Sequence, residues 1–138
     1  MAEGVATVGV EPERWYLIFE TRAPARWLRW IAMGRFKHVS ALGWLPEQRL
    51  WVHYDVRLGR TRVAVLPDCQ AAADRIHELR KHAETIVFTP VAERMRWLRL
   101  GFWCVPAMAH LVGVKGTPLR PDALFRLCLE QGGAIAER

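Results

Sequence analysis

Long apolar runs, closely spaced cysteines and internal repeats are all missing from this 138-residue chain. No run of 18 or more apolar residues is present, and the N-terminus lacks a basic segment followed by an apolar one, so we predict neither a membrane span nor a signal peptide. The three cysteines are far apart without a CxxC pattern, which argues against a disulfide framework or a structural zinc site and favours a reducing compartment. A cytoplasmic location is therefore expected.

Apolar residues are abundant enough for one folded domain. They make up 51% of the sequence and include seven tryptophans, which excludes bulk disorder and low complexity. A chain of this length can bury a core without disulfides. Residues 1–13 are small, polar or proline-containing and are predicted to form a flexible leader. Residues 14–138 are predicted to form a single domain.

The charge balance is strongly basic. The net charge is +6 with a pI near 9.9, and 17 of the 20 basic residues are arginine. Arginine binds phosphate and stacks on rings, so nucleic acid, an anionic membrane or an acidic partner would suit the chain. A GC-rich coding sequence is a slightly better explanation of the arginines. We find no zinc finger, RNP sequence or glycine-rich phosphate loop. The candidate anionic-surface contacts are Arg26, Arg29, Arg35, Arg94, Arg96 and Arg99.

Hydrophobic patterns predict an α+β fold in which an antiparallel sheet of about four to five strands packs against helices. Aromatic and β-branched runs predict strands at 15–21, 36–44, 50–56, 61–66 and 85–89, the middle three forming a meander. Helical spacing and caps predict helices at 25–33, 68–81, 104–112 and from about 121 to Gly132. Asp68 is the expected N-cap of the second of these. The basic run at 91–100 fits either a helix or an extended connection.

Cys104 stands where an apolar helix is about to begin. Pro106 follows two residues later, and proline is tolerated only in the first turn of a helix. There the unpaired N–H groups and the positive end of the helix dipole favour a thiolate, which is the form that attacks carbonyl groups. Free cysteine is also among the most buried residue types, so a simple core role for Cys104 stays open. Cys69 is expected only to pack, and Cys128, on the apolar stripe of the last predicted helix, is expected in the core.

A nucleophilic thiol needs a base, and the base needs a polar group to orient it. His38 opens one apolar run and is the candidate base. His53 and Asp55 lie two residues apart on the next predicted strand, so their side chains share a face. His38 joins them only if the strand register allows, and the sequence does not fix that register. Noncatalytic positions on exposed strand ends would explain the same residues.

A resemblance to a known family rests on short motifs between residues 36 and 134. The motifs are Phe36-Lys37-His38-Val39, Trp51-Val52-His53-Tyr54-Asp55, Trp103-Cys104-Val105, Leu111-Val112-Gly113-Val114, Thr117-Pro118, Leu124 and Gly132-Gly133-Ala134. Together they resemble small phage-encoded proteins related to the permuted NlpC/P60 (papain-like) group. The resemblance implies that His38 is the base, Cys104 the nucleophile and Asp55 the orienting residue, with His53 as the alternate third residue.

The resemblance also implies a reaction class. Thiolate attack on an amide, ester or thioester would give an acyl-enzyme that water then hydrolyses, with the Cys104 amide as an oxyanion donor and no cofactor. Members of the group act on cell-wall peptides or on lipid esters, so the acyl substrate stays open. Two other functions also stay open: a noncatalytic structural or accessory protein, associated with a phage particle, and a basic module that binds nucleic acid or an anionic membrane.

Overall fold

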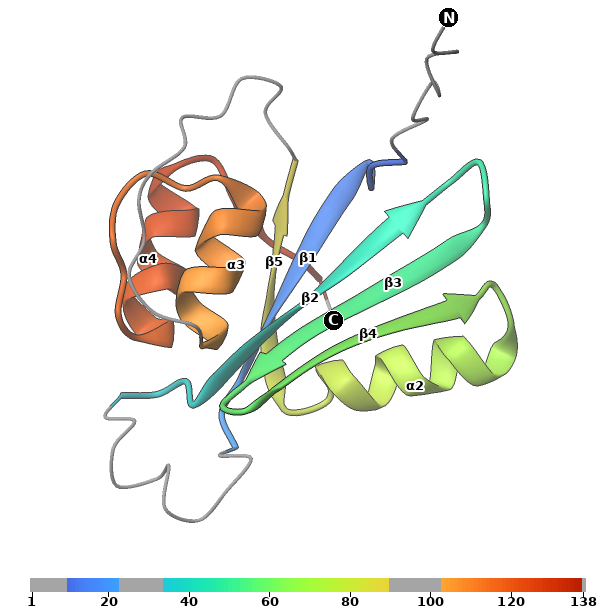
Figure 1. The fold of residues 1–138 in the computed structure, drawn as a ribbon, viewed down its shortest axis with the longest axis horizontal. Helices are drawn as coiled ribbons and strands as arrows, with labels where there is room; N and C mark the ends of the chain where they lie inside the picture. Colours follow the sequence, from blue (N-terminus) through green and yellow to red (C-terminus); the bar gives the residue numbers. More distant parts are fainter. Residues whose placement is uncertain (1–9, 23–33, 90–102, 138) are drawn as a thin grey trace, which may run out of the picture.

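The fold comes from a computed structural model that describes residues 10–22, 34–89 and 103–137 (Figure 1). Within these residues it is an α+β fold, an open six-stranded antiparallel sheet in the order β4-β3-β2-β1-β5-β6 with three helices packed against it. The elements are β1 (Arg14–Glu20), β2 (His38–Leu45), β3 (Leu50–Arg57), β4 (Arg60–Pro67), α2 (Gln70–Arg80), β5 (Ala83–Phe88), α3 (Cys104–Val112), α4 (Pro121–Glu130) and β6 (Ala134–Ile135).

The α+β class and the central meander are confirmed, but the strand count is not. The sheet has six strands instead of four to five, because the two-residue strand β6 pairs with β5. Two residues are too short to leave an alternating pattern in the sequence. The division into a leader and a single domain stays a prediction, and so do the elements expected at 25–33 and 91–100, which lie outside the described residues.

Two tight hairpins set the register of β2, β3 and β4. The chain between β3 and β4 turns through Leu58 and Gly59, and Gly59 has a φ of 79°, a left-handed conformation that costs glycine little. The resulting register places His53 opposite Leu42 on β2 and opposite Ala64 on β4. Every second residue along β3 therefore projects from the same face of the sheet.

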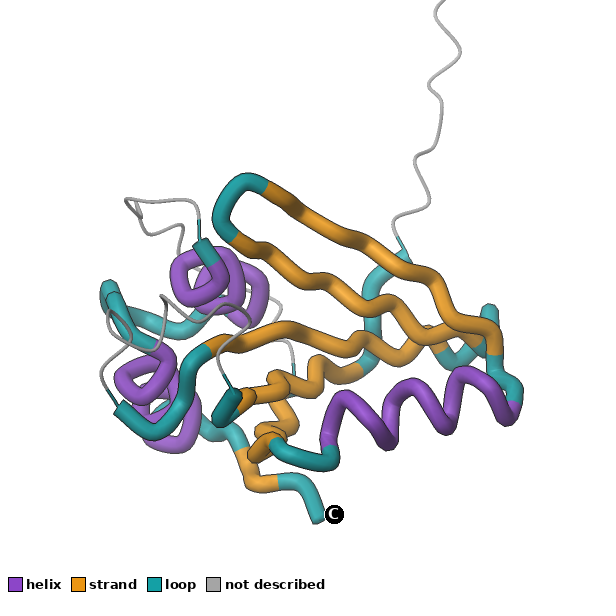
Figure 2. The backbone as a smooth tube through the Cα atoms, turned by 90° about the horizontal axis from the view of Figure 1, so that it is seen from below, coloured by secondary structure: helices purple, strands orange, loops and turns teal. Residues whose placement is uncertain are grey.

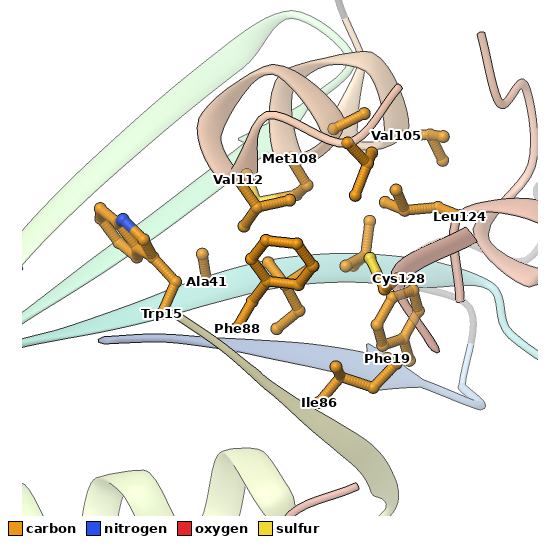
Figure 3. Packing of buried hydrophobic residues seen from close by; sticks show 14 of the residues in the cluster. Trp15, Phe19, Ala41, Ile86, Phe88, Val105, Met108, Val112, Leu124 and Cys128 are labelled. Atoms are coloured by element: carbon orange, nitrogen blue, oxygen red, sulfur yellow. The ribbon is translucent and has the colours of Figure 1, made fainter. Parts of the chain in front are cut away.

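The two faces of the sheet are covered by different helices. Figures 2 and 3 show α3 and α4 on one face and α2 on the other. The main core lies under α3 and α4, where Phe19 and Met108 are fully buried. The Phe19 ring meets the rings of Phe36 and Phe125 at centroid distances of 5.4 and 5.1 Å. The core therefore fixes α3 and α4 against the middle of the sheet.

The helix boundaries follow the predicted signals with one correction. As predicted, α3 begins at Cys104 and ends at Gly113, whose φ of 72° is the left-handed C-cap conformation. Asp68, expected to cap α2, instead accepts hydrogen bonds from the Arg49 guanidinium, and Cys69 is the N-cap residue, without a side-chain capping bond. Arg49 lies at the end of the β2–β3 turn, so Asp68 ties this turn to the start of α2.

Asp122 in the first turn of α4 holds the segment that leads into β2. Its two carboxylate oxygens accept the backbone N–H groups of Arg35 and Phe36 at 3.0 and 3.2 Å. Gly34 has a φ of 118°, and a Cβ atom at this position would collide with the Asp122 carboxylate. The entry into β2, and with it the position of His38, is therefore fixed by α4.

Leu124→Ala is expected to lower the free energy of unfolding by about 2–5 kcal/mol, because Leu124 is fully buried between α4 and the sheet. The matched control is Leu129→Ala in the same helix, where 37% of the side chain is exposed. Urea denaturation measures both changes. Equal losses for the two variants would contradict the packing of α4 described here.

Candidate active site

Three elements bring the candidate residues to one end of the sheet. The N-terminal end of α3 lies beside the point where β2 begins and β3 ends, and α3 packs against both strands (Figure 1). Cys104 is the first residue of α3, His38 is the first residue of β2, and Asp55 lies two residues before the end of β3. Residues far apart in the sequence therefore share one corner of the fold.

His38 and Asp55 form a buried pair. The His38 Nε2 atom lies 2.6 Å from Asp55 Oδ1, and the two side chains are only 4% and 7% exposed. The β2–β3 register places Leu42 opposite His53, so alternation puts His38 and Asp55 on one face of the sheet, whereas Val39 and Tyr54 pack into the core under α3 and α4. The register that the sequence left open is thus the one that brings these two residues together.

Cys104 is the third member of the group. Its side chain lies close enough to the His38 ring to be one of the causes, after Asp55, that raise the pKa of the imidazole. Because Nε2 is bonded to Asp55, Nδ1 is the ring nitrogen left to act on the sulfur. His38 is therefore bonded to a carboxylate and close to a thiol, the combination that a thiol nucleophile with an oriented base requires.

The helix start places backbone donors beside the sulfur. Trp103 is the N-cap of α3, and the first helical hydrogen bond runs from Ala107 N–H to the Trp103 carbonyl oxygen at 3.3 Å. The N–H groups of Cys104 and Val105 therefore have no partner within the helix, and Pro106 has no N–H. The Cys104 amide, which is the expected oxyanion donor, thus has no acceptor inside the helix.

The pKa values of the buried pair move in opposite directions. Burial lowers the pKa of His38, but hydrogen bonds to Asp55 and Cys104 and the charges of these partners outweigh it and raise the pKa from 6.5 to about 9. Burial raises the pKa of Asp55, but His38 and Arg57 outweigh it and lower the pKa from 3.8 to about 2. Imidazolium and carboxylate therefore coexist at neutral pH.

Arg57 is a site residue that the sequence analysis did not single out. Its Nε atom donates to Asp55 Oδ2 at 2.8 Å, and its side chain is 37% exposed, so it reaches from the buried carboxylate to the surface. Asp55 and Arg57 are two residues apart on one strand and therefore share a face. Arg57 lies one residue beyond the strand predicted at 50–56, so the sequence pattern did not point to it.

His53, the alternate third residue, occupies a different place. It is buried on the same face, and its Nε2 atom has no hydrogen-bond partner among the described residues. Burial lowers the pKa of His53, and the nearby charge of Asp55 opposes this only in part. The ring nitrogen of His38 is held by Asp55, so the geometry favours Asp55 over His53 as the orienting group.

The other two cysteines differ sharply from Cys104. Cys128 is fully buried in the core, as predicted, and burial raises the pKa of its thiol to about 12. Cys69, which was expected only to pack, is exposed at the N-cap of α2. Cys104 is partly buried. The remaining histidines, His77, His82 and His110, are exposed.

Only one of the six predicted anionic-surface arginines lies in the described residues. Arg35 forms an ion pair with Glu84 at 2.9 Å, and its guanidinium carbon lies 5.1 Å from the centre of the Phe36 ring. The other five are Arg26, Arg29, Arg94, Arg96 and Arg99, and they lie outside these residues. In the described segments no helix is long and apolar enough to cross a bilayer, and no three metal-binding side chains group together.

A small apolar cavity lies along the same face of α3 as Cys104. Ala107 and Leu111 follow Cys104 at helical spacings of three and seven residues, so the three side chains form one stripe. The cavity has a volume of about 230 Å³. It is lined by Trp15, Val52, Tyr54, Val63, Ala107, His110 and Leu111. Cys104, His38 and Asp55 are not among the lining residues.

Comparisons with known proteins return no relative for this chain: no family model, no curated protein and no solved structure matches it. The likeness to the papain-like group therefore stays a prediction that rests on short motifs. Function is inferred below from the geometry of Cys104, His38 and Asp55.

The buried pair makes stability depend on pH in a defined way. The raised pKa of His38 contributes stability that is fully present below pH 6.5 and is lost as the pH rises through about 9. The lowered pKa of Asp55 contributes stability that is present above pH 3.8 and is lost as the pH falls through about 2. The pair therefore stabilises the fold most between about pH 4 and pH 6.5.

Asp55→Asn is expected to lower the free energy of unfolding by about 3 kcal/mol at pH 5.5, because it leaves the buried imidazolium without its counterion. At pH 10, where His38 is neutral, the loss should be smaller. Urea unfolding at both pH values measures the difference, with exposed Asp74→Asn as a control that changes little at either. A loss that is the same at pH 5.5 and pH 10 would argue against the ion pair.

Proposed function

We propose that this chain is a cysteine-dependent acyl-transfer enzyme, a thiol hydrolase in which Cys104 is the nucleophile, His38 the general acid and base, and Asp55 the orienting carboxylate. The observation that carries the proposal is that one buried imidazole is bonded to Asp55 and lies close enough to the Cys104 thiol for the thiol to raise its pKa. A nucleophile, a base and a carboxylate that orients the base are the parts that a catalytic triad requires.

The first half of the reaction uses the thiolate and imidazolium pair. The Cys104 sulfur attacks the carbonyl carbon of an amide, ester or thioester and forms a C–S bond, while the Cys104 backbone N–H stabilises the developing oxyanion. The bond from the carbonyl carbon to the leaving nitrogen, oxygen or sulfur breaks, and the His38 imidazolium gives its proton to the leaving group. The product is an acyl-enzyme with a neutral His38.

The second half returns the site to its starting state. Neutral His38 accepts a proton from water as the water oxygen attacks the thioester carbonyl. The C–S bond then breaks, the carboxylic acid leaves, and thiolate and imidazolium are restored. Asp55 stays ionised throughout and holds Nε2–H of His38, so the opposite nitrogen faces the sulfur and the water.

We also propose that the chain has the permuted papain-like, NlpC/P60-type arrangement. The support is the order of the parts: a histidine that opens a strand, a carboxylate on the neighbouring strand, and then a cysteine at a helix N-terminus. The substrate proposed on this basis is an acyl group on nitrogen, oxygen or sulfur, such as a cell-wall peptide or a lipid ester.

Iodoacetamide at pH 6 is expected to alkylate Cys104 at least about tenfold faster than Cys69 in the native protein. Both cysteines lie at a helix N-terminus, and Cys69 is the more exposed of the two, but Cys104 is the one that lies close enough to His38 to raise the pKa of that histidine. A rate advantage for Cys104 must therefore come from His38. Mass spectrometry of the labelled peptides gives both rates in one sample.

His38→Ala should remove this advantage, whereas His77→Ala, an exposed histidine on α2, should leave it intact. Alkylation of Cys69 as fast as Cys104 in the wild-type protein would count against the proposed enzyme. A noncatalytic accessory role would then be favoured, and binding to DNA or anionic vesicles that falls with salt would instead favour a basic binding module.

Incubation with p-nitrophenyl acetate is expected to acetylate Cys104 and to release p-nitrophenol in an initial burst, because the thioester forms faster than water removes it. Intact-mass and peptide analysis locate the acetyl group. Cys104→Ser should reduce the burst at least about 100-fold, and Cys69→Ser should leave it unchanged. Acetylation that persists in the Cys104 variant would show that the site does not carry the reaction.

A further inference from the structure

Both carboxylate oxygens of Asp55 have a hydrogen-bond partner, although one oxygen is enough to orient a catalytic histidine. Oδ1 lies 2.6 Å from His38 Nε2, and Oδ2 accepts a hydrogen bond from Arg57 Nε at 2.8 Å. The carboxylate is only 7% exposed, whereas the Arg57 side chain is 37% exposed. The arginine is thus a permanent positive charge that reaches the buried carboxylate from the surface.

In the proposed reaction the His38 imidazolium gives up its proton and becomes neutral. Once the imidazolium has given its proton to the leaving group, Asp55 would be a buried carboxylate without a cation if His38 were its only partner. A buried carboxylate in that position takes up a proton or turns away. Either change would release Nε2–H of His38, and the ring would then lose the tautomer that directs Nδ1 at the incoming water.

We propose that Arg57 is a positioning residue that keeps Asp55 ionised and oriented while His38 is neutral, and so supports hydrolysis of the acyl-enzyme more than its formation. This inference rests on the proposed function. Arg57 acts through Asp55, and its guanidinium stays charged in both halves of the reaction.

The position of Arg57 in the fold suits this role. It is the last residue of β3 and lies opposite Arg60 beside the tight turn that contains Gly59. The short hairpin fixes its backbone, and alternation along β3 places its side chain beside Asp55. The charged and titratable groups that face this cluster are Glu20 on β1, His38 on β2, His53 and Arg57 on β3, Arg62 on β4, Arg75 on α2 and Cys104 on α3.

Arg62 offers a matched control. It lies directly opposite Asp55 on β4, so its removal takes the same charge from the same neighbourhood. The hydrogen bonds to Asp55 come from His38 and Arg57. Comparing Arg57→Gln with Arg62→Gln therefore separates the bond to Asp55 from the general effect of one positive charge.

The test is the reaction of the full chain with p-nitrophenyl acetate, followed in two phases. Arg57→Gln should slow the decay of acetyl-Cys104 about tenfold or more and change the burst rate less than about threefold. Arg57→Lys, which restores the charge, should recover most of the decay rate, and Arg62→Gln should match the wild type in both phases. Circular dichroism and the melting temperature report whether each variant is folded.

A second measurement does not depend on turnover. Carbon-detected NMR of Asp55 should show its titration moving upward in Arg57→Gln, from about 2 toward 3.8, and staying in place in Arg62→Gln. Equal slowing of both phases, no slowing of decay, or an unmoved Asp55 titration in Arg57→Gln would each overturn the inference while the proposed enzyme stands. A wild-type protein that forms no acetyl-Cys104 would overturn both.

Discussion

One constraint governs the structure: the carboxylate of Asp55 is buried, so its negative charge must be balanced by positive charges beside it. A buried carboxylate is costly unless it is paired and hydrogen-bonded, and the two cations that meet this one are His38 and Arg57. The same bond fixes the imidazole ring, because Nε2 points at Oδ1 and only Nδ1 is left to face Cys104. The bond between Asp55 and His38 therefore balances the buried charge and orients the imidazole ring at the same time.

The rest of the fold serves to bring that pair to a helix N-terminus. The hydrophobic core fixes α3 against the sheet, and Asp122 on α4 holds the backbone just before His38. The hairpin turn after Arg57 sets the end of β3, so that Asp55 and Arg57 lie on one face. Elements from the first half of the chain supply the base and its partners, and an element from the second half supplies the sulfur.

Local signals in the sequence predicted much of this arrangement. Pro106 and Gly113 predict the limits of α3, and alternating apolar residues predict β2 to β4. Helix ends and strands can be predicted in this way because they depend on residues that are close in the sequence. The contact between His38 and Asp55 depends on strand register, and the contact with Cys104 depends on how α3 packs, so neither follows from local pattern. Asp68 was misassigned as a cap because its partner Arg49 is 19 residues away, and the two-residue strand β6 left no signal. Arg57 was overlooked among 17 arginines, since only its place beside a buried carboxylate distinguishes it.

The most direct test of the account is the titration of His38 by ¹⁵N NMR in the wild-type protein and in Cys104→Ala. The contact with the thiol is one of the causes that raise the pKa of His38 to about 9, together with Asp55. Removing the sulfur should therefore lower the pKa of His38, while the bond to Asp55 remains. An identical titration of His38 in the two proteins would mean that imidazole and thiol do not interact, and would contradict the proposed site.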